Sequence, residues 1–189
     1  MKLGDLCAFR NESVSVDDTD PDRYISTDSM LPNRGGIAAA SAIPSNGKVR
    51  RYEAGDTLIS NIRPYFKKIW QADVSGTCSA DVLVFKPSSR CNSDYLYWLL
   101  SSDAFFDYVV LTSRGTKMPR GDKNAMLDFV VPEHDSHEQT VIVEMLNPIR
   151  EKLALNQKTN DYLAAWVARF PRRQAHRPSA WEAKNLVDL

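Results

Sequence analysis

Residues 136–170, SHEQTVIVEMLNPIREKLALNQKTNDYLAAWVARF, are the stretch that decides the fold of this chain. Apolar side chains recur in it at alternating spacings of four and three residues, and two asparagines take the same positions near its middle. A two-position seam of this kind is typical of a helix that packs along a second helix. The seam consists of Ile142, Leu146, Ile149, Leu153, Asn156, Asn160, Leu163, Val167 and Phe170.

A capping box predicts where this helix begins. The hydroxyl of Ser136 is placed to accept a hydrogen bond from the amide of Gln139, whose side chain would reach back to the Ser136 amide. A helix of 34 residues would be about 50 Å long, which is longer than a domain of this size can bury by itself. Pro148 leaves two alternatives open, because Asn147-Pro148 can start a second helix and a proline inside one helix kinks it.

The rest of the chain has the composition of one ordinary compact domain. Of the 189 residues 43% are hydrophobic and 10% aromatic, enough to bury a core. We therefore predict an α+β fold, in which a compact mixed domain of residues 1–135 precedes a long coiled-coil-type helix over 136–170. A basic tail follows over 171–189.

The cysteines and the hydropathy indicate a cytoplasmic protein. Cys7, Cys78 and Cys91 are odd in number and widely spaced, so we expect buried, reduced thiols. No apolar run is long enough for a membrane span, and residues 1–5 do not resemble a signal peptide.

Local patterns predict the elements of the compact domain. Alternating or continuous apolar runs bounded by turn residues predict strands at 24–26, 57–62 and 80–85. Asn46-Gly47 predicts a tight turn, and Asn33-Arg34-Gly35-Gly36 predicts another turn. Helices are predicted at 94–100, with Ser93 as the N-cap, and at 103–111, and a polar basic loop at 112–124.

The charge is balanced overall but unevenly distributed. The 24 basic residues equal the 24 acidic ones, which argues against a protein that is basic over its whole surface. Residues 11–28 hold six acids against one arginine, whereas 46–70 and 114–123 are basic. A neutral protein of this kind can still present one basic face.

Two basic loops are candidates for binding nucleic acid. One leaves the end of a predicted strand at 63–68, and the other spans 113–124. Both combine cations suited to phosphates or guanine edges with small residues that let a backbone approach closely, although either loop taken alone is more typical of a solvated surface. The candidate residues are Arg63, Tyr65, Lys67, Lys68, Arg114, Thr116, Lys117, Arg120 and Lys123.

No motif in the sequence predicts catalysis. His134 and His137 straddle the predicted helix start, where capping explains the segment better than a metal site does. The acidic segment 18–22 lacks the glycine and the final glutamate of a calcium loop. Asp22 with Glu182 and Lys184 forms a nuclease-like set only across the whole length of the chain. Asn61-Ile62-Arg63-Pro64-Tyr65 lacks the first proline of the amino-methyltransferase motif.

Several segments in a fixed order resemble the specificity subunit of type I restriction-modification systems. They cover roughly residues 1–170, and no one of them is specific alone. They are Gly55-Asp56-Thr57-Leu58-Ile59-Ser60-Asn61-Ile62-Arg63-Pro64-Tyr65, Ser79 to Pro87, Tyr95-Leu96-Tyr97-Trp98-Leu99-Leu100, Gly115-Thr116 leading to Val130-Val131-Pro132, Glu138-Gln139 and Leu153-Ala154-Leu155-Asn156-Gln157.

The resemblance implies a target recognition domain that binds one half-site of double-stranded DNA. It implies a non-catalytic chain whose long helix packs on a counterpart and docks a methyltransferase subunit, with a restriction subunit as a further partner. S-adenosylmethionine, ATP and Mg²⁺ would then be bound by those partners, and this chain would hold no cofactor. The loops at 63–68 and 114–124 fall where the DNA-facing loops of the family lie.

The chain departs from the family in one respect. A full specificity subunit has two recognition domains and two such helices, whereas this chain has one of each. The resemblance therefore implies a half-subunit that acts as a homodimer on an interrupted symmetric site. A truncated remnant, or a protein-interaction module without DNA binding, is the alternative.

Overall fold

A computed structural model describes residues 1–40 and 42–169. They form a compact unit up to Asn147, and Pro148 begins a second unit. The long helix begins at residue 136, as the sequence predicted, and its first three turns belong to the compact unit. The seam residue Phe170 and the predicted tail at 171–189, with Glu182 and Lys184, lie outside the described residues.

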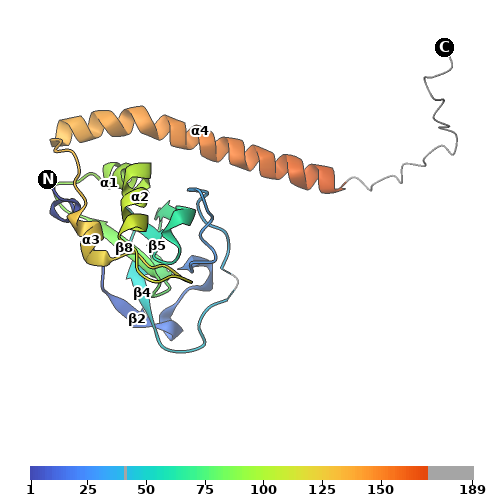
Figure 1. The fold of residues 1–189 in the computed structure, drawn as a ribbon. Coiled ribbons are helices and arrows are strands. Elements are labelled where there is room, and N and C mark those ends of the chain that lie inside the picture. The colour runs from blue at the N-terminus through green and yellow to red at the C-terminus, as the bar shows by residue number, and fades with distance from the viewer. Residues whose placement is uncertain (41, 170–189) are drawn as a thin grey trace, which may run out of the picture. The chain divides into compact units, whose positions relative to one another are not determined.

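Two four-stranded sheets form the compact unit (Figure 1). The first has the order β1 (Cys7–Phe9), β8 (Val82–Pro87), β5 (Thr57–Ser60), β6 (Ile69–Gln71), with every pair antiparallel. The second has the order β2 (Ser13–Ser15), β4 (Lys48–Tyr52), β7 (Gly76–Cys78), β3 (Tyr24–Ile25). Only the β3–β7 pair in it is parallel. The predicted α+β class is confirmed.

The first sheet is buried on both faces, which explains the continuous apolar run in β8. Successive side chains of a strand point to opposite faces. Leu83 and Phe85 accordingly belong to one core cluster and Val82 and Val84 to another. Helices cover the face that carries Leu83 and Phe85. Residues of the second sheet join the cluster on the face that carries Val82 and Val84.

Four helices complete the fold, with bounds α1 Ser93–Ser101, α2 Asp103–Leu111, α3 Lys123–Asp128 and α4 Ser136–Arg169. The predicted bounds of α2 are confirmed. The N-cap of α1 is Asn92 and not Ser93, because the Asn92 side chain accepts from the amides of Asp94 and Tyr95. None of the helices in residues 1–40 and 42–169 is long and apolar enough to cross a membrane. Short 3₁₀ turns lie at Leu3–Asp5, Val16–Asp18, Pro21–Arg23 and Pro64–Phe66.

Helix α4 begins with a different capping box from the predicted one. The Asp135 carboxylate accepts from the amide of Glu138 at 2.9 Å, and the Glu138 carboxylate accepts from the amide of Asp135 at 2.9 Å. The prediction of Ser136 with Gln139 was therefore off by one residue. The same segment offers both pairs, and charged acceptors make the stronger hydrogen bonds. The helix runs through Pro148 without a break, so the two-helix alternative is wrong.

Gln139 is instead buried, and its side chain links α4 to the segment before α1 by hydrogen bonds. Its side chain is 2% exposed. The Oε1 atom accepts from the amide of Asn92 at 2.9 Å, and Nε2 donates to the carbonyls of Arg90 and His134. Nearby, the indole of Trp98 donates to Asn147 at 3.1 Å. These bonds fix the start of α4 on the compact unit.

We expect Gln139→Ala to lower the free energy of unfolding by about 2 kcal/mol, because it leaves a buried amide and two carbonyls without a partner. Chemical denaturation followed by circular dichroism measures the change. Gln157→Ala removes an exposed glutamine on the same helix and is the matched control. Equal effects of the two changes would contradict the structural role given to Gln139.

The three cysteines are free and buried, as predicted. Burial raises the pKa of the Cys7 and Cys78 thiols to about 12 and that of Cys91 to about 11. These thiols are therefore protonated near neutral pH and are poor nucleophiles.

Candidate nucleic-acid interface

The first basic loop leaves β5 and turns sharply. Arg63 and Lys67 flank the turn Pro64–Phe66, and both have left-handed backbone conformations, with φ of 51° and 50°. This geometry leaves Tyr65 and Phe66 48% and 39% exposed. Their ring centroids lie 4.7 Å apart, so the loop presents a pair of aromatic side chains between cations.

The second basic loop is a small closed structure. Arg114 and Arg120 form an antiparallel bridge, in which each amide donates to the other's carbonyl at 2.9 Å. The loop is shorter than predicted, because α3 begins at Lys123. Asp122 caps that helix by accepting from two backbone amides, which lowers the pKa of its carboxyl. Thr116 and Lys117 lie in the segment between the two arginines.

The two loops, which were predicted separately, lie side by side. The amide of Arg63 donates to the carbonyl of Pro119 at 2.8 Å, and Ile62 forms a bridge with Arg120. The backbone of Asn61 further accepts from Gly121. The candidate residues of the two loops thus belong to one backbone-linked surface of the compact unit.

A third loop, which the sequence indicated only as a turn, joins this surface. The amide of Asn33 donates to the carbonyl of Phe66 at 2.8 Å, and that of Arg34 to Lys67 at 2.9 Å. Among residues 1–40 and 42–169, the non-glycine residues with positive φ are Asn33, Arg34, Arg63 and Lys67. Backbone strain of this kind persists where surrounding structure enforces it, and such residues cluster at functional sites. Here all four lie on two hydrogen-bonded loops.

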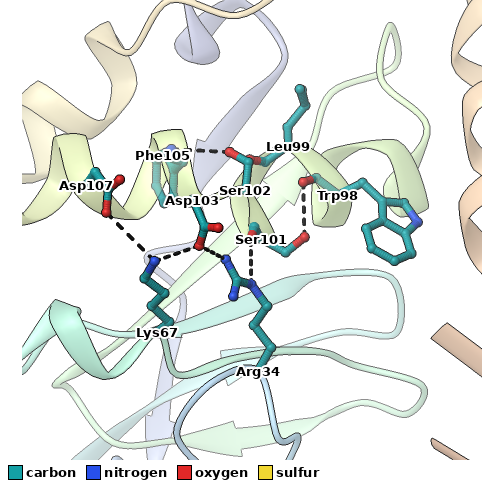
Figure 2. A network of polar contacts seen from close by, with 9 residues as sticks. All are labelled: Arg34, Lys67, Trp98, Leu99, Ser101, Ser102, Asp103, Phe105 and Asp107. Carbon is teal, nitrogen blue, oxygen red and sulfur yellow. Dashed lines mark hydrogen bonds and ion pairs between the residues drawn. The ribbon is translucent and has the colours of Figure 1, made fainter. Parts of the chain in front are cut away.

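Carboxylates pair with several cations of this surface. The Asp103 carboxylate lies 2.6 Å from both Arg34 and Lys67 (Figure 2), and these two hydrogen bonds hold its pKa down at about 2. Arg120 pairs with Asp81 at 3.1 Å and Arg114 with Asp122 at 2.8 Å.

The remaining candidates differ in how they are held. Lys68 donates to the carbonyl of Thr27 at 2.7 Å, and the ammonium of Lys123 lies 6.0 Å from the centre of the Phe9 ring. In the described part of the chain, neither Arg63 nor Lys117 has an ion pair. The surface therefore combines free and paired cations with exposed aromatic rings, an arrangement that suits binding of a polyanion.

The histidine-rich segment before α4 has a structural contact. The Nδ1 atom of His134 shares a hydrogen bond with the hydroxyl of Tyr95 at 2.7 Å, and His137 is exposed on the first turn of the helix. Within residues 1–40 and 42–169, no group of three or more His, Cys, Asp or Glu side chains is placed to hold a metal ion.

The seam of α4 divides into two parts. Ile142 packs against the core of the compact unit, and Leu146 is half-buried. From Ile149 onward the seam is exposed, with more than half of each apolar side chain accessible. The exposed members are Ile149, Leu153, Asn156, Asn160, Leu163 and Val167.

Comparison with known proteins gives one curated relative and several solved structures. No protein-family model matches the chain. The type I restriction enzyme EcoDI specificity subunit of Escherichia coli is 26% identical over 98 residues, which make up 52% of this chain and 22% of that protein. The HsdS subunit from Thermoanaerobacter tengcongensis matches with a TM-score of 0.60 and 21% identity, over 95% of this chain and 51% of that one. A type I restriction-modification S subunit from M. genitalium matches with a TM-score of 0.57 and 13% identity, over 87% of this chain and 44% of that one.

These matches confirm the resemblance found in the sequence. The chain has the fold of the matched specificity subunits. It spans about half the length of each solved chain.

Proposed function

We propose that this chain is a sequence-specific DNA-recognition subunit of a type I restriction-modification complex. The observation that carries the proposal is the meeting of the loops at 63–68 and 113–124 on one surface, through the 2.8 Å bond from Arg63 to Pro119. Two separate basic segments would be ordinary solvated loops. Joined and interleaved with exposed aromatic rings, they make a surface on which cations contact phosphates while the loop tips reach base edges.

In this proposal the chain binds DNA and does no chemistry on it. Methylation, and cleavage where a restriction subunit takes part, belong to partner subunits. S-adenosylmethionine, ATP and Mg²⁺ would bind to those partners. This chain would supply the sequence to which they are directed.

A two-fold assembly of this chain is part of the proposal. Two copies related by a two-fold axis would place two recognition units on two half-sites, so that the target is symmetric and interrupted. The exposed seam from Ile149 to Val167 supports this arrangement, because it offers a long apolar strip for a second helix. The same helix pair would dock the methyltransferase subunit.

We expect the double change Arg114→Ala and Lys117→Ala to weaken DNA binding strongly without unfolding the domain. Each phosphate contact contributes a slope of about −0.9 to the plot of log affinity against log salt, so the slope should become shallower by about two. Titration of the complex with the methyltransferase subunit against fluorescent duplex DNA, over a series of salt concentrations, measures it.

The matched control removes two positive charges from elsewhere, with Lys2→Ala and Lys48→Ala. Both lysines are exposed and lie outside the three loops. Equal slopes for the two double variants would show that the loop is only solvated. A wild-type chain that binds the methyltransferase subunit but no DNA would instead favour a protein-interaction module.

A further inference from the structure

Asp103 bridges two cations that come from two different loops. One of its carboxylate oxygens lies 2.6 Å from the guanidinium of Arg34 and 2.6 Å from the ammonium of Lys67 (Figure 2). Asp107, one turn further along α2, lies 3.7 Å from Lys67. The two cations thus converge on a single anionic oxygen.

The carboxylate is more exposed to solvent than the two cations that it pairs with. The Asp103 side chain is 69% exposed, whereas those of Arg34 and Lys67 are 32% and 24% exposed. Lys67 is a candidate interface residue, and the Arg34 amide is bonded to its carbonyl.

We propose that Arg34 and Lys67 form a binding site for one backbone phosphate of duplex DNA, and that Asp103 occupies this site in the free protein. The inference rests on the proposed function and adds to it a phosphate contact, Arg34, that sequence patterns did not indicate. A phosphate oxygen and a carboxylate oxygen are both anionic acceptors. A guanidinium and an ammonium bind either of them with the same charge-assisted hydrogen bonds.

The site does not depend on Asp103 for its shape. The Nε atom of Arg34 donates to the carbonyl of Ser101 at 2.6 Å, and the guanidinium lies 5.8 Å from the centre of the Phe106 ring. These contacts position Arg34 whichever anion is bound. Because exposed ion pairs contribute little to stability, the carboxylate can be displaced without disrupting the fold.

The consequence for recognition is selectivity. A duplex held by few contacts has to expel the carboxylate to gain this phosphate contact, and gains little by doing so. A duplex aligned on the correct site makes its full set of contacts, and these contacts favour displacement of the Asp103 carboxylate. Asp103 therefore lowers the affinity for non-specific DNA more than the affinity for the target, and the ratio between the two affinities is what sets specificity.

Asp103→Asn tests the proposal, with Asp107→Asn as the matched control on the same helix. Both remove one negative charge, but only the first releases both cations. We expect Asp103→Asn to tighten binding of random-sequence duplex DNA by roughly tenfold at about 0.1 M salt, and to steepen the salt slope by about one. Asp107→Asn should have a clearly smaller effect. Titration of the methyltransferase complex with fluorescent duplexes measures both.

A gain of affinity cannot arise from unfolding, which makes this variant informative. Adding Lys67→Gln to Asp103→Asn should remove the gain. If Asp103→Asn and Asp107→Asn change affinity equally, or neither changes it, the phosphate site is wrong while DNA recognition stands. If neither the wild type nor Asp103→Asn binds any duplex, the proposed function fails and this inference with it.

Discussion

Asp56→Ala is expected to lower the free energy of unfolding by about 3 to 5 kcal/mol, the usual range when one partner of a buried ion pair is removed. Arg10 and Asp56 are joined by two hydrogen bonds, at 2.7 and 3.3 Å. Their side chains are only 4% and 3% exposed. The change leaves the Arg10 guanidinium buried next to the exposed carboxylates of Glu12 and Glu53, which compensate it only in part. Thermal and urea denaturation of the purified chain measure the loss.

The control for this prediction is Asp128→Ala, which breaks the exposed pair with Lys2. Exposed pairs contribute between zero and about 1 kcal/mol. Similar losses from the two variants would mean that burial of Arg10 is relieved by water or by movement of its segment. The role given to the Arg10–Asp56 pair would then be wrong.

Leu153→Asp together with Leu163→Asp should convert the proposed dimer into a monomer. A buried leucine contributes about 1.5 to 3 kcal/mol, and a dimer would lose four of them, so its dissociation constant should rise by more than about 10⁴. Light scattering would then give the 21.3 kDa mass of one chain in place of twice that value. Both leucines are more than half exposed, so the melting temperature of the compact unit should not change.

Ala154→Asp with Ala165→Asp is the matched control, since both alanines are exposed on the same helix and lie off the seam. This variant should still form dimers. A wild-type chain that is monomeric at all concentrations would overturn the homodimer but not DNA recognition. A double seam variant that remains dimeric would show that the copies associate through another surface.

The sequence predicted the elements whose signals are local. The bounds of α2 were predicted to the residue, and in the structure the Ser102 side chain caps this helix by accepting from the amide of Phe105. The two errors in capping, Ser93 for Asn92 and Ser136 for Asp135, have a common cause. Two polar residues adjoin each helix start, and the choice between them depends on geometry that spacing does not contain.

The parts that were missed depend on contacts between distant segments. Arg34 lies in a turn whose glycines suggested only a change of direction, and it becomes part of the site through α2 and the loop at 63–68. The contact of Arg63 with Pro119 is likewise tertiary. Gln139 was assigned to a cap. Its burial results from packing on the segment before α1, and local sequence patterns do not show such a contact. Local patterns therefore predicted which loops to examine, but not how they fit together.

The first residues of the chain are paired with a segment made much later. The Met1 nitrogen donates to the carbonyl of Val131 at 3.2 Å, across 130 residues of sequence, and the amide of Leu3 donates to Phe129. Strand β1 likewise pairs with β8, which is made later. At about 5 to 20 residues per second, translation separates Met1 from Val131 by roughly 6 to 26 seconds. Strand β1 has no partner until β8 has been made, because Cys7 pairs with Pro87, 80 residues later in the sequence. At the same rate of synthesis this takes roughly 4 to 16 seconds, and the first sheet cannot be completed before then.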